Sequence, residues 1–109
     1  MADKAITRDQ LAELGRAAEL EPARARYAYV YAVALDSTGK QSEAIEVLKQ
    51  SLARHPGDRD TLAALIGFNR EAGDSAAALS YAEQLAEAEP ANAELKTLIE
   101  VLRRQVEKR

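Results

Sequence analysis

Three prolines recur at one spacing, and this spacing constrains the fold more than any other feature of the chain. Pro22, Pro56 and Pro90 follow one another at intervals of 34 residues in a sequence of 109 residues. Gly39 and Gly73 keep the same interval. A fixed period of this length is typical of repeat proteins, in which one supersecondary unit stacks on the next. We therefore expect the chain to be built from repeated units.

Each period contains two amphipathic helical patterns, with apolar residues at i, i+3, i+4 and i+7 on one face. Proline cannot continue a helix, and glycine accepts the left-handed conformation that often ends one. Asp58 and Ser75 are the expected N-caps of the helices that follow them. The residues expected to face inward are Ala28, Tyr31, Ala32 and Leu35, then Leu62, Leu65, Ile66 and Asn69 one period later, and in the second helices Ala44, Ile45, Leu48, Ser51, Leu52, Ala78, Leu79, Ala82, Leu85 and Ala86.

The segment 27–35 permits a second interpretation, because its apolar residues also alternate with a period of two, as in a strand. Its neighbours are rich in Ala, Leu, Glu, Arg and Lys, which favour helices. The repeat and this helix-rich neighbourhood together predict an all-α chain.

A 34-residue helix–turn–helix unit with small residues at fixed places and a closing proline resembles the tetratricopeptide (TPR) repeat. Ala32 stands where the family has its small residue in the first helix, and Ala44 and Ala78 stand where the two helices cross. Ala28 and Leu62 depart from the pattern, because the family frequently has tryptophan there. The resemblance implies a right-handed TPR α-solenoid of antiparallel helix pairs.

The resemblance divides the chain into two full repeats, a preceding half repeat and a C-terminal capping helix. We expect these parts to form a single TPR domain over residues 1–109. The second helix of the incomplete repeat spans 7–22, the full repeats span 25–58 and 59–92, and the capping helix spans 93–107.

The segment 7–20 matches the second helix of a repeat whose first helix is missing, and Thr7 with Gln10 forms a predicted capping box at its start. Without the first helix, Leu11 and Leu14 would be partly bare. We therefore expect the chain to be the C-terminal fragment of a longer bacterial TPR-containing protein. The bare face also predicts a homodimer through this helix.

TPR arrays resemble one another in placing their first helices on a concave face where partner peptides lie. Tyr29 is two residues from both Tyr27 and Tyr31, about 200° around the helix, and so points away from them into the predicted groove. An apolar groove suits an amphipathic helix or a hydrophobic peptide, so we predict a protein-interaction scaffold. The candidate groove residues are Tyr29, Val30, Val33, Asp36, Ala63, Ala64, Gly67, Arg70, Leu98 and Val101.

An alternative function remains open, in which the groove side chains only pack within the protein. The segment would then be a non-binding structural or regulatory arm of a larger enzyme or multihaem cytochrome. A third role, the clamping of a chaperone's C-terminal carboxylate, is rejected. Family members with that role use Lys, Asn, Asn, Lys and Arg, where this chain has Tyr29, Val33, Ala64, Glu94 and Leu98.

Composition argues against other classes of function. The net charge of −3 lacks the basic balance of nucleic-acid-binding proteins. The chain has no cysteine, and its one histidine, His55, is expected to cap a helix or to face solvent, so we expect no catalytic residue, cofactor or metal site. No apolar run approaches the roughly 20 residues of a membrane helix, and we expect a soluble protein of a bacterial cytoplasm or periplasm.

Overall fold

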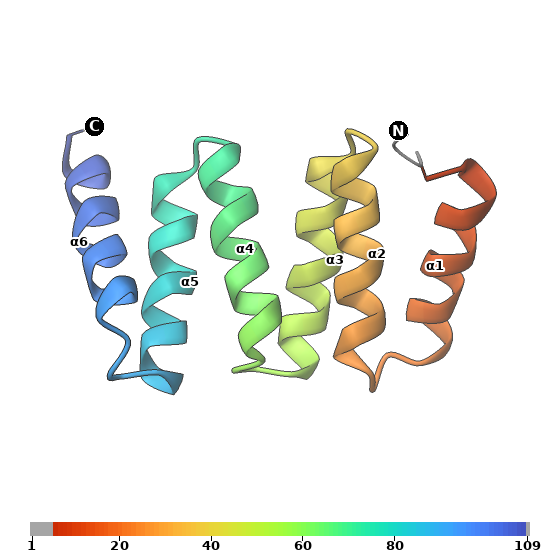
Figure 1. Cartoon of the computed structure of the whole chain (residues 1–109), viewed down its shortest axis with the longest axis horizontal. Helices are drawn as coiled ribbons and strands as arrows, with labels where there is room; N and C mark the ends of the chain where they lie inside the picture. The colour runs from red at the N-terminus through yellow and green to blue at the C-terminus, as the bar shows by residue number, and fades with distance from the viewer. Residues whose placement is uncertain (1–5, 109) are drawn as a thin grey trace. The chain divides into compact units, whose positions relative to one another are not determined.

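The computed structural model describes residues 6–108, and these residues form helices joined by turns, with no strand (Figure 1). The prediction of an all-α chain is confirmed, and the alternative strand over 27–35 is wrong because these residues lie inside a helix. The helices are α1 (Arg8–Leu20), α2 (Ala25–Ser37), α3 (Gln41–Arg54), α4 (Arg59–Glu71), α5 (Ser75–Ala88) and α6 (Ala93–Glu107).

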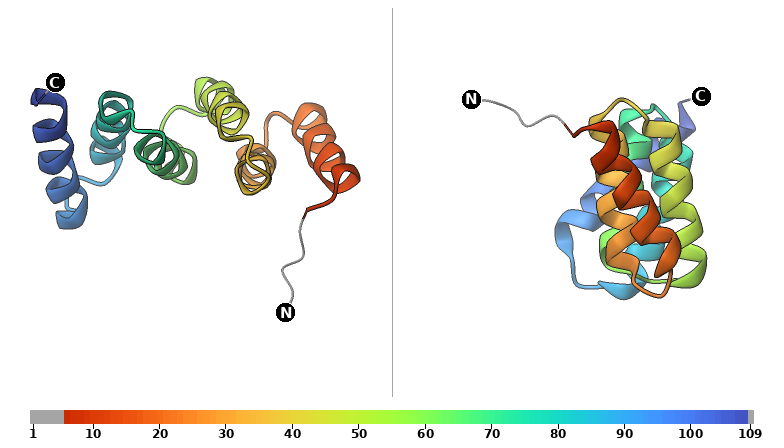
Figure 2. Two further views of the ribbon diagram at one scale, coloured as in Figure 1. Left: turned by 90° about the horizontal axis from the view of Figure 1, so that it is seen from above. Right: turned by 90° about the vertical axis from the view of Figure 1, so that its right-hand side faces the viewer.

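The chain divides into two compact units, Met1–Pro56 and Gly57–Arg109. In the first unit, α2 packs against both α1 and α3. In the second unit, α5 packs against both α4 and α6, and Figure 2 shows the two sets of helices from two further directions. The single TPR domain and its solenoid stacking stay predictions.

Helices α2 and α4 end at glycines in the left-handed conformation, as the sequence predicts. The φ angle is 84° at Gly39 and 81° at Gly73. Just after Gly39, the amide of Lys40 donates to the carbonyl oxygen of Leu35 at 2.9 Å. In the same way, the amide of Asp74 donates to the carbonyl oxygen of Asn69 at the end of α4, at 2.8 Å. This pattern satisfies carbonyl groups that the helix end would leave without partners.

The other repeated stop lies immediately before each proline. Glu21, His55 and Glu89 end α1, α3 and α5 with φ and ψ of −130° and 66°, −130° and 70°, and −133° and 65°. A residue before proline is pushed out of the helical region by the proline ring. The same backbone geometry therefore recurs at the period seen in the sequence, and the fold is a helical repeat in this sense.

The first N-cap agrees with the sequence prediction in full. The amide of Gln10 donates to Oγ1 of Thr7 at 3.0 Å, and the amide of Thr7 donates back to Oε1 of Gln10 at 2.9 Å. This pair of bonds is a capping box, and it sets the start of α1.

Of the next two predicted N-caps, one is confirmed and one is wrong. Asp58 caps α4, because its carboxylate accepts from the amide of Thr61 at 3.0 Å. The prediction of Ser75 is wrong: Asp74 caps α5 by accepting from the amide of Ala77 at 3.0 Å. The carboxylate stands one residue earlier and reaches the third helical amide, which makes Ser75 the first residue inside the helix.

The predicted inward face of α4 is confirmed, because all four of its residues are buried, including Asn69. Asn69 tolerates this position since its Nδ2 donates to the carbonyl oxygen of Leu65 at 2.8 Å. Ala44 and Ala78 are fully buried, as expected where α3 packs on α2 and α5 packs on α4. The predicted face of α2 is buried only in part, because Ala28 and Tyr31 are half-buried.

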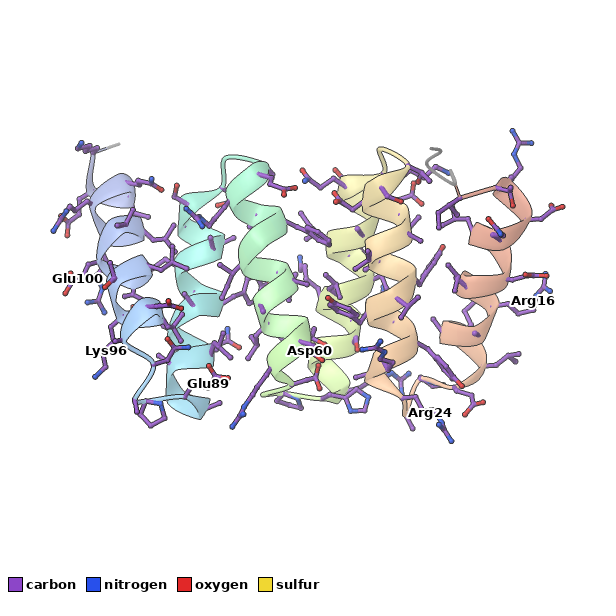
Figure 3. All side chains as sticks on the ribbon, in the orientation of Figure 1. Arg16, Arg24, Asp60, Glu89, Lys96 and Glu100 are labelled. Atoms are coloured by element: carbon purple, nitrogen blue, oxygen red, sulfur yellow. The ribbon has the colours of Figure 1, made fainter. Side chains whose placement is uncertain are left out.

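Helix α6 covers one side of α5. Its residues Leu95, Ile99 and Leu102 are buried, and Arg103 pairs with Glu83 of α5 at 3.1 Å. On its other side, Lys96 and Glu100 point away from α5 (Figure 3). The predicted bounds of this helix agree with the observed ones.

Helix α1 is the least buried helix of the first unit. None of its residues is buried, Leu11 and Leu14 are half-buried, and Leu20 is 73% exposed. Arg16 points away from α2 (Figure 3). This exposure agrees with the expectation of a partly bare apolar face, whereas dimerisation through α1 stays a prediction.

Candidate functional site

Four of the predicted groove residues lie on α2 in the first unit. Val33 is 41% exposed, which is high for a large apolar side chain, while Tyr29 and Val30 are half-buried beside it. Val33 lies four residues after Tyr29 and three after Val30, so its side chain neighbours both of them on the helix surface. Asp36, also half-buried, accepts a 3.4 Å hydrogen bond from Nε2 of Gln41.

The positively charged guanidinium of Arg26 lies over the aromatic ring of Tyr29 on this helix face. The guanidinium carbon of Arg26 lies 5.9 Å from the ring centre of Tyr29, a cation–π geometry at a partly exposed site. A partner that covers Tyr29 would have to pack around Arg26 or displace it.

The remaining six predicted groove residues lie on α4 and α6 in the second unit. On α4, Ala63 and Arg70 are exposed, whereas Ala64 and Gly67 are half-buried. A Cβ built on Gly67 would meet no atom within 4 Å, so the space beside it is open.

On α6, Val101 is 36% exposed and Leu98 is half-buried. Helices α4 and α6 both pack on α5 and not on each other. The second unit thus places its predicted groove residues on two helices that a third helix joins. A groove that continues from α2 to α4 stays a prediction.

A cleft in the first unit was not predicted from the sequence. It has a volume of about 430 Å³ and is bordered by all three helices of this unit. Three of the residues that line it are small, namely Gly15 and Ala18 of α1 and Ala28 of α2. The full lining is Gly15, Ala18, Glu19, Pro22, Ala28, Tyr31, Val47, Gln50, Ser51 and Arg54.

Ser51 is the polar group in the wall of this cleft that lacks a partner. Its side chain is buried, with 6% of the residue exposed, and its Oγ makes no hydrogen bond. Tyr31 forms another part of the wall, and its ring lies so close to α1 that a Cβ on Gly15 would stand 2.9 Å from Cζ. The sequence contained one signal of the cleft, namely Ala28 at the place that Leu62 occupies one period later.

The sequence predicted that His55 caps a helix or faces solvent, but its side chain instead bonds to another segment. Its Nε2 lies 3.0 Å from the carbonyl oxygen of Pro22, which accepts a hydrogen bond from the ring. The bond joins the end of α3 to the turn that follows α1. A shallow hollow of about 490 Å³ lies beside it, lined by residues 20–24, Arg54 and His55.

Among residues 6–108, no group of three or more His, Cys, Asp or Glu side chains is arranged to hold a metal ion. No helix in the same range is both long enough and apolar enough to cross a membrane.

Comparison of the sequence with protein-family models and with curated proteins yields no match. The resemblance to the TPR family thus rests on the 34-residue spacing and on the glycines and prolines that end the helices.

Proposed function

We propose that this chain is a TPR scaffold whose groove binds an amphipathic helix or hydrophobic peptide of another protein. The observation that carries the proposal is the exposure of Val33 and Val101. Among residues 6–108, the exposed large hydrophobic residues are these two and Leu20, so two of the three belong to the predicted groove.

The face of α2 supports the apolar character of the partner. Val33 and the half-buried Tyr29 and Val30 form a continuous apolar strip along the helix. An amphipathic helix presents apolar side chains at the same three- and four-residue spacing, so its apolar strip can cover this one. Burying one partly exposed valine contributes only about 1 kcal/mol or less, so specific binding requires the whole strip.

The TPR assignment is supported by local geometry. The stops before Pro22, Pro56 and Pro90 share one backbone conformation, and the glycine stops of α2 and α4 share another. Both recur at the 34-residue period of the sequence. Ala44 and Ala78, the small residues of the helix crossing, are fully buried.

The test is a pull-down with the full chain, comparing wild type with a Tyr29→Ala/Val33→Asp double variant. Ala53→Asp adds the same charge at an exposed position of α3 and serves as the control. Circular dichroism must show that all three proteins are equally helical. We expect a partner that wild type and the control retain and the double variant loses.

A partner identified in this way must then bind directly. Isothermal titration with a synthetic peptide of its apolar helix should give a dissociation constant that the double variant raises at least tenfold. Equal retention of every protein by all three chains would refute the groove proposal. That result would favour the alternative, a structural or regulatory arm of a larger protein.

A further inference from the structure

Arg26 places a positive charge at the N-terminal end of the apolar strip of α2, which consists of Tyr29, Val30 and Val33. Its side chain is exposed, and its guanidinium carbon lies 5.9 Å from the ring centre of Tyr29. Tyr29 and Val30 stand three and four positions after Arg26, so its neighbours along the helix surface belong to the strip. A helix that covers this end of the strip therefore also reaches Arg26.

Within residues 6–108, no carboxylate pairs with this charge. The ion pairs in this range join other residues, such as Arg24 with Glu21 at 3.0 Å. Asp36 stands at the opposite end of the strip. The ring of Tyr29 does not replace a carboxylate, because it attracts the guanidinium through its quadrupole and carries no net charge.

Covering Arg26 without a counter-charge would oppose binding. Removing a charged group from water costs free energy unless opposite charge and hydrogen bonds replace the water. A carboxylate supplies both, since it can accept two parallel hydrogen bonds from one guanidinium. An apolar side chain of a partner at this place supplies neither.

We propose that the helix bound in the groove carries an acidic residue about one turn beyond its apolar strip, and that this carboxylate pairs with Arg26. The inference rests on the proposed function and narrows the partner from amphipathic helices in general to those with an acidic residue at this place. Tyr29, Val30 and Val33 accept any apolar strip of matching spacing, whereas Arg26 discriminates among such strips by charge.

The experiment is an NMR titration of the ¹⁵N-labelled full chain with two designed peptides at low ionic strength. Both are capped, alanine-rich helices with leucines at i, i+3, i+4 and i+7 and glutamines on the opposite face. One has a single glutamate one turn before the first leucine, and its twin has glutamine there. Because a peptide can lie in either direction along α2, one glutamate is enough to reach Arg26.

We expect both peptides to cause saturable shifts of amide signals in α2. The glutamate peptide should bind about two- to fivefold more tightly than its twin, which is the range expected for one partly exposed ion pair. Added salt should reduce this preference in the wild-type chain, because it screens the pair.

Two variants locate the charge that is responsible. Arg26→Gln should make the two peptides bind with equal affinity. Arg54→Gln removes the same charge from an exposed position of α3 and is the matched control, which should keep the preference. Circular dichroism must show that both variants are as helical as the wild type, as expected for exposed side chains.

The outcomes separate a failure of the pairing from a failure of the groove. If both peptides shift the signals of α2 and bind the wild type equally, the groove stands and the pairing with Arg26 is overturned. A preference that survives in Arg26→Gln also overturns the pairing, since another cation would be responsible. If neither peptide causes saturable shifts in α2, the groove proposal fails and the inference fails with it.

Discussion

Gly15 and Gly67 allow a matched test of the packing around helical glycines. Gly15 lies inside α1 and Gly67 inside α4. Glycine in a helix interior is less favourable than alanine by about 0.8–1.0 kcal/mol, so Gly→Ala alone should stabilise either helix by that amount. The surroundings differ, because an added Cβ meets no atom within 4 Å at Gly67 but meets Tyr31 Cζ at 2.9 Å at Gly15.

We expect Gly67→Ala to stabilise the protein by about 1 kcal/mol, which corresponds to a rise in Tm of roughly 4 °C. At Gly15 the added methyl group meets the outer end of the half-buried Tyr31 side chain, which must shift, so the cost lies at the low end of the roughly 1–3 kcal/mol that overpacking takes in a core. The gain in helix propensity and this strain oppose each other. Gly15→Ala should therefore leave stability nearly unchanged, and so about 1 kcal/mol below the effect of Gly67→Ala.

The assay is urea and thermal unfolding of both variants, followed by circular dichroism at 222 nm. If the two units unfold in separate transitions, Gly67→Ala should move that of the second unit and Gly15→Ala that of the first. Repeating Gly15→Ala in a Tyr31→Leu background isolates the contact, because the propensity gain should reappear once the ring is gone.

A stabilisation by Gly15→Ala equal to that by Gly67→Ala would refute the reasoning. The ring of Tyr31 would then not lie against α1, and the wall of the cleft would be wrongly drawn. A failure of Gly67→Ala to stabilise would instead show that the surface beside α4 is occupied, contrary to the open space at this residue.

Three further predictions use urea unfolding as their readout. Asp74→Ala should cost about 1 kcal/mol, because it removes the N-cap of α5, whereas Ser75→Ala should cost less than half of that; the reverse order would contradict the assignment of the cap. Ala44→Leu should destabilise by about 1–3 kcal/mol, because the residue is fully buried, and unchanged stability would mean that α2 and α3 do not meet there. His55→Ala should cost about 0.5–1.5 kcal/mol through the lost bond to Pro22, and no change would show that the bond contributes nothing.

Apart from the N-cap of α5, where Asp74 stands one residue before the predicted Ser75, and the side-chain bond of Asn69, the missed features join residues distant in the sequence. The bond from His55 to Pro22 spans 33 positions, and the unpartnered hydroxyl of Ser51 shows only once three helices are packed. The inward position of Asn69 was predicted, whereas the hydrogen bond that pairs its buried side-chain amide with Leu65 was not. For the predicted groove, the structure gives the exposure of each residue, whereas a groove that continues from α2 to α4 stays a prediction.

The sequence alone determined the helices and where they end, because these depend on neighbouring residues. Positive φ at Gly39 and Gly73 follows from the lack of a side chain, and the stops before Pro22, Pro56 and Pro90 follow from the clash of the proline ring with the preceding residue. The capping box of Thr7 and Gln10 is likewise a bond between residues three apart.

Only the tertiary structure decided which helices pack together and where space remains between them. An amphipathic pattern states that a face is buried, but it names no partner for that face. The sequence therefore identified Ala28 as small, and the packing of α1, α2 and α3 showed that its smallness leaves a cleft. The volume beside a small side chain depends on the side chains around it, and these come from distant parts of the chain.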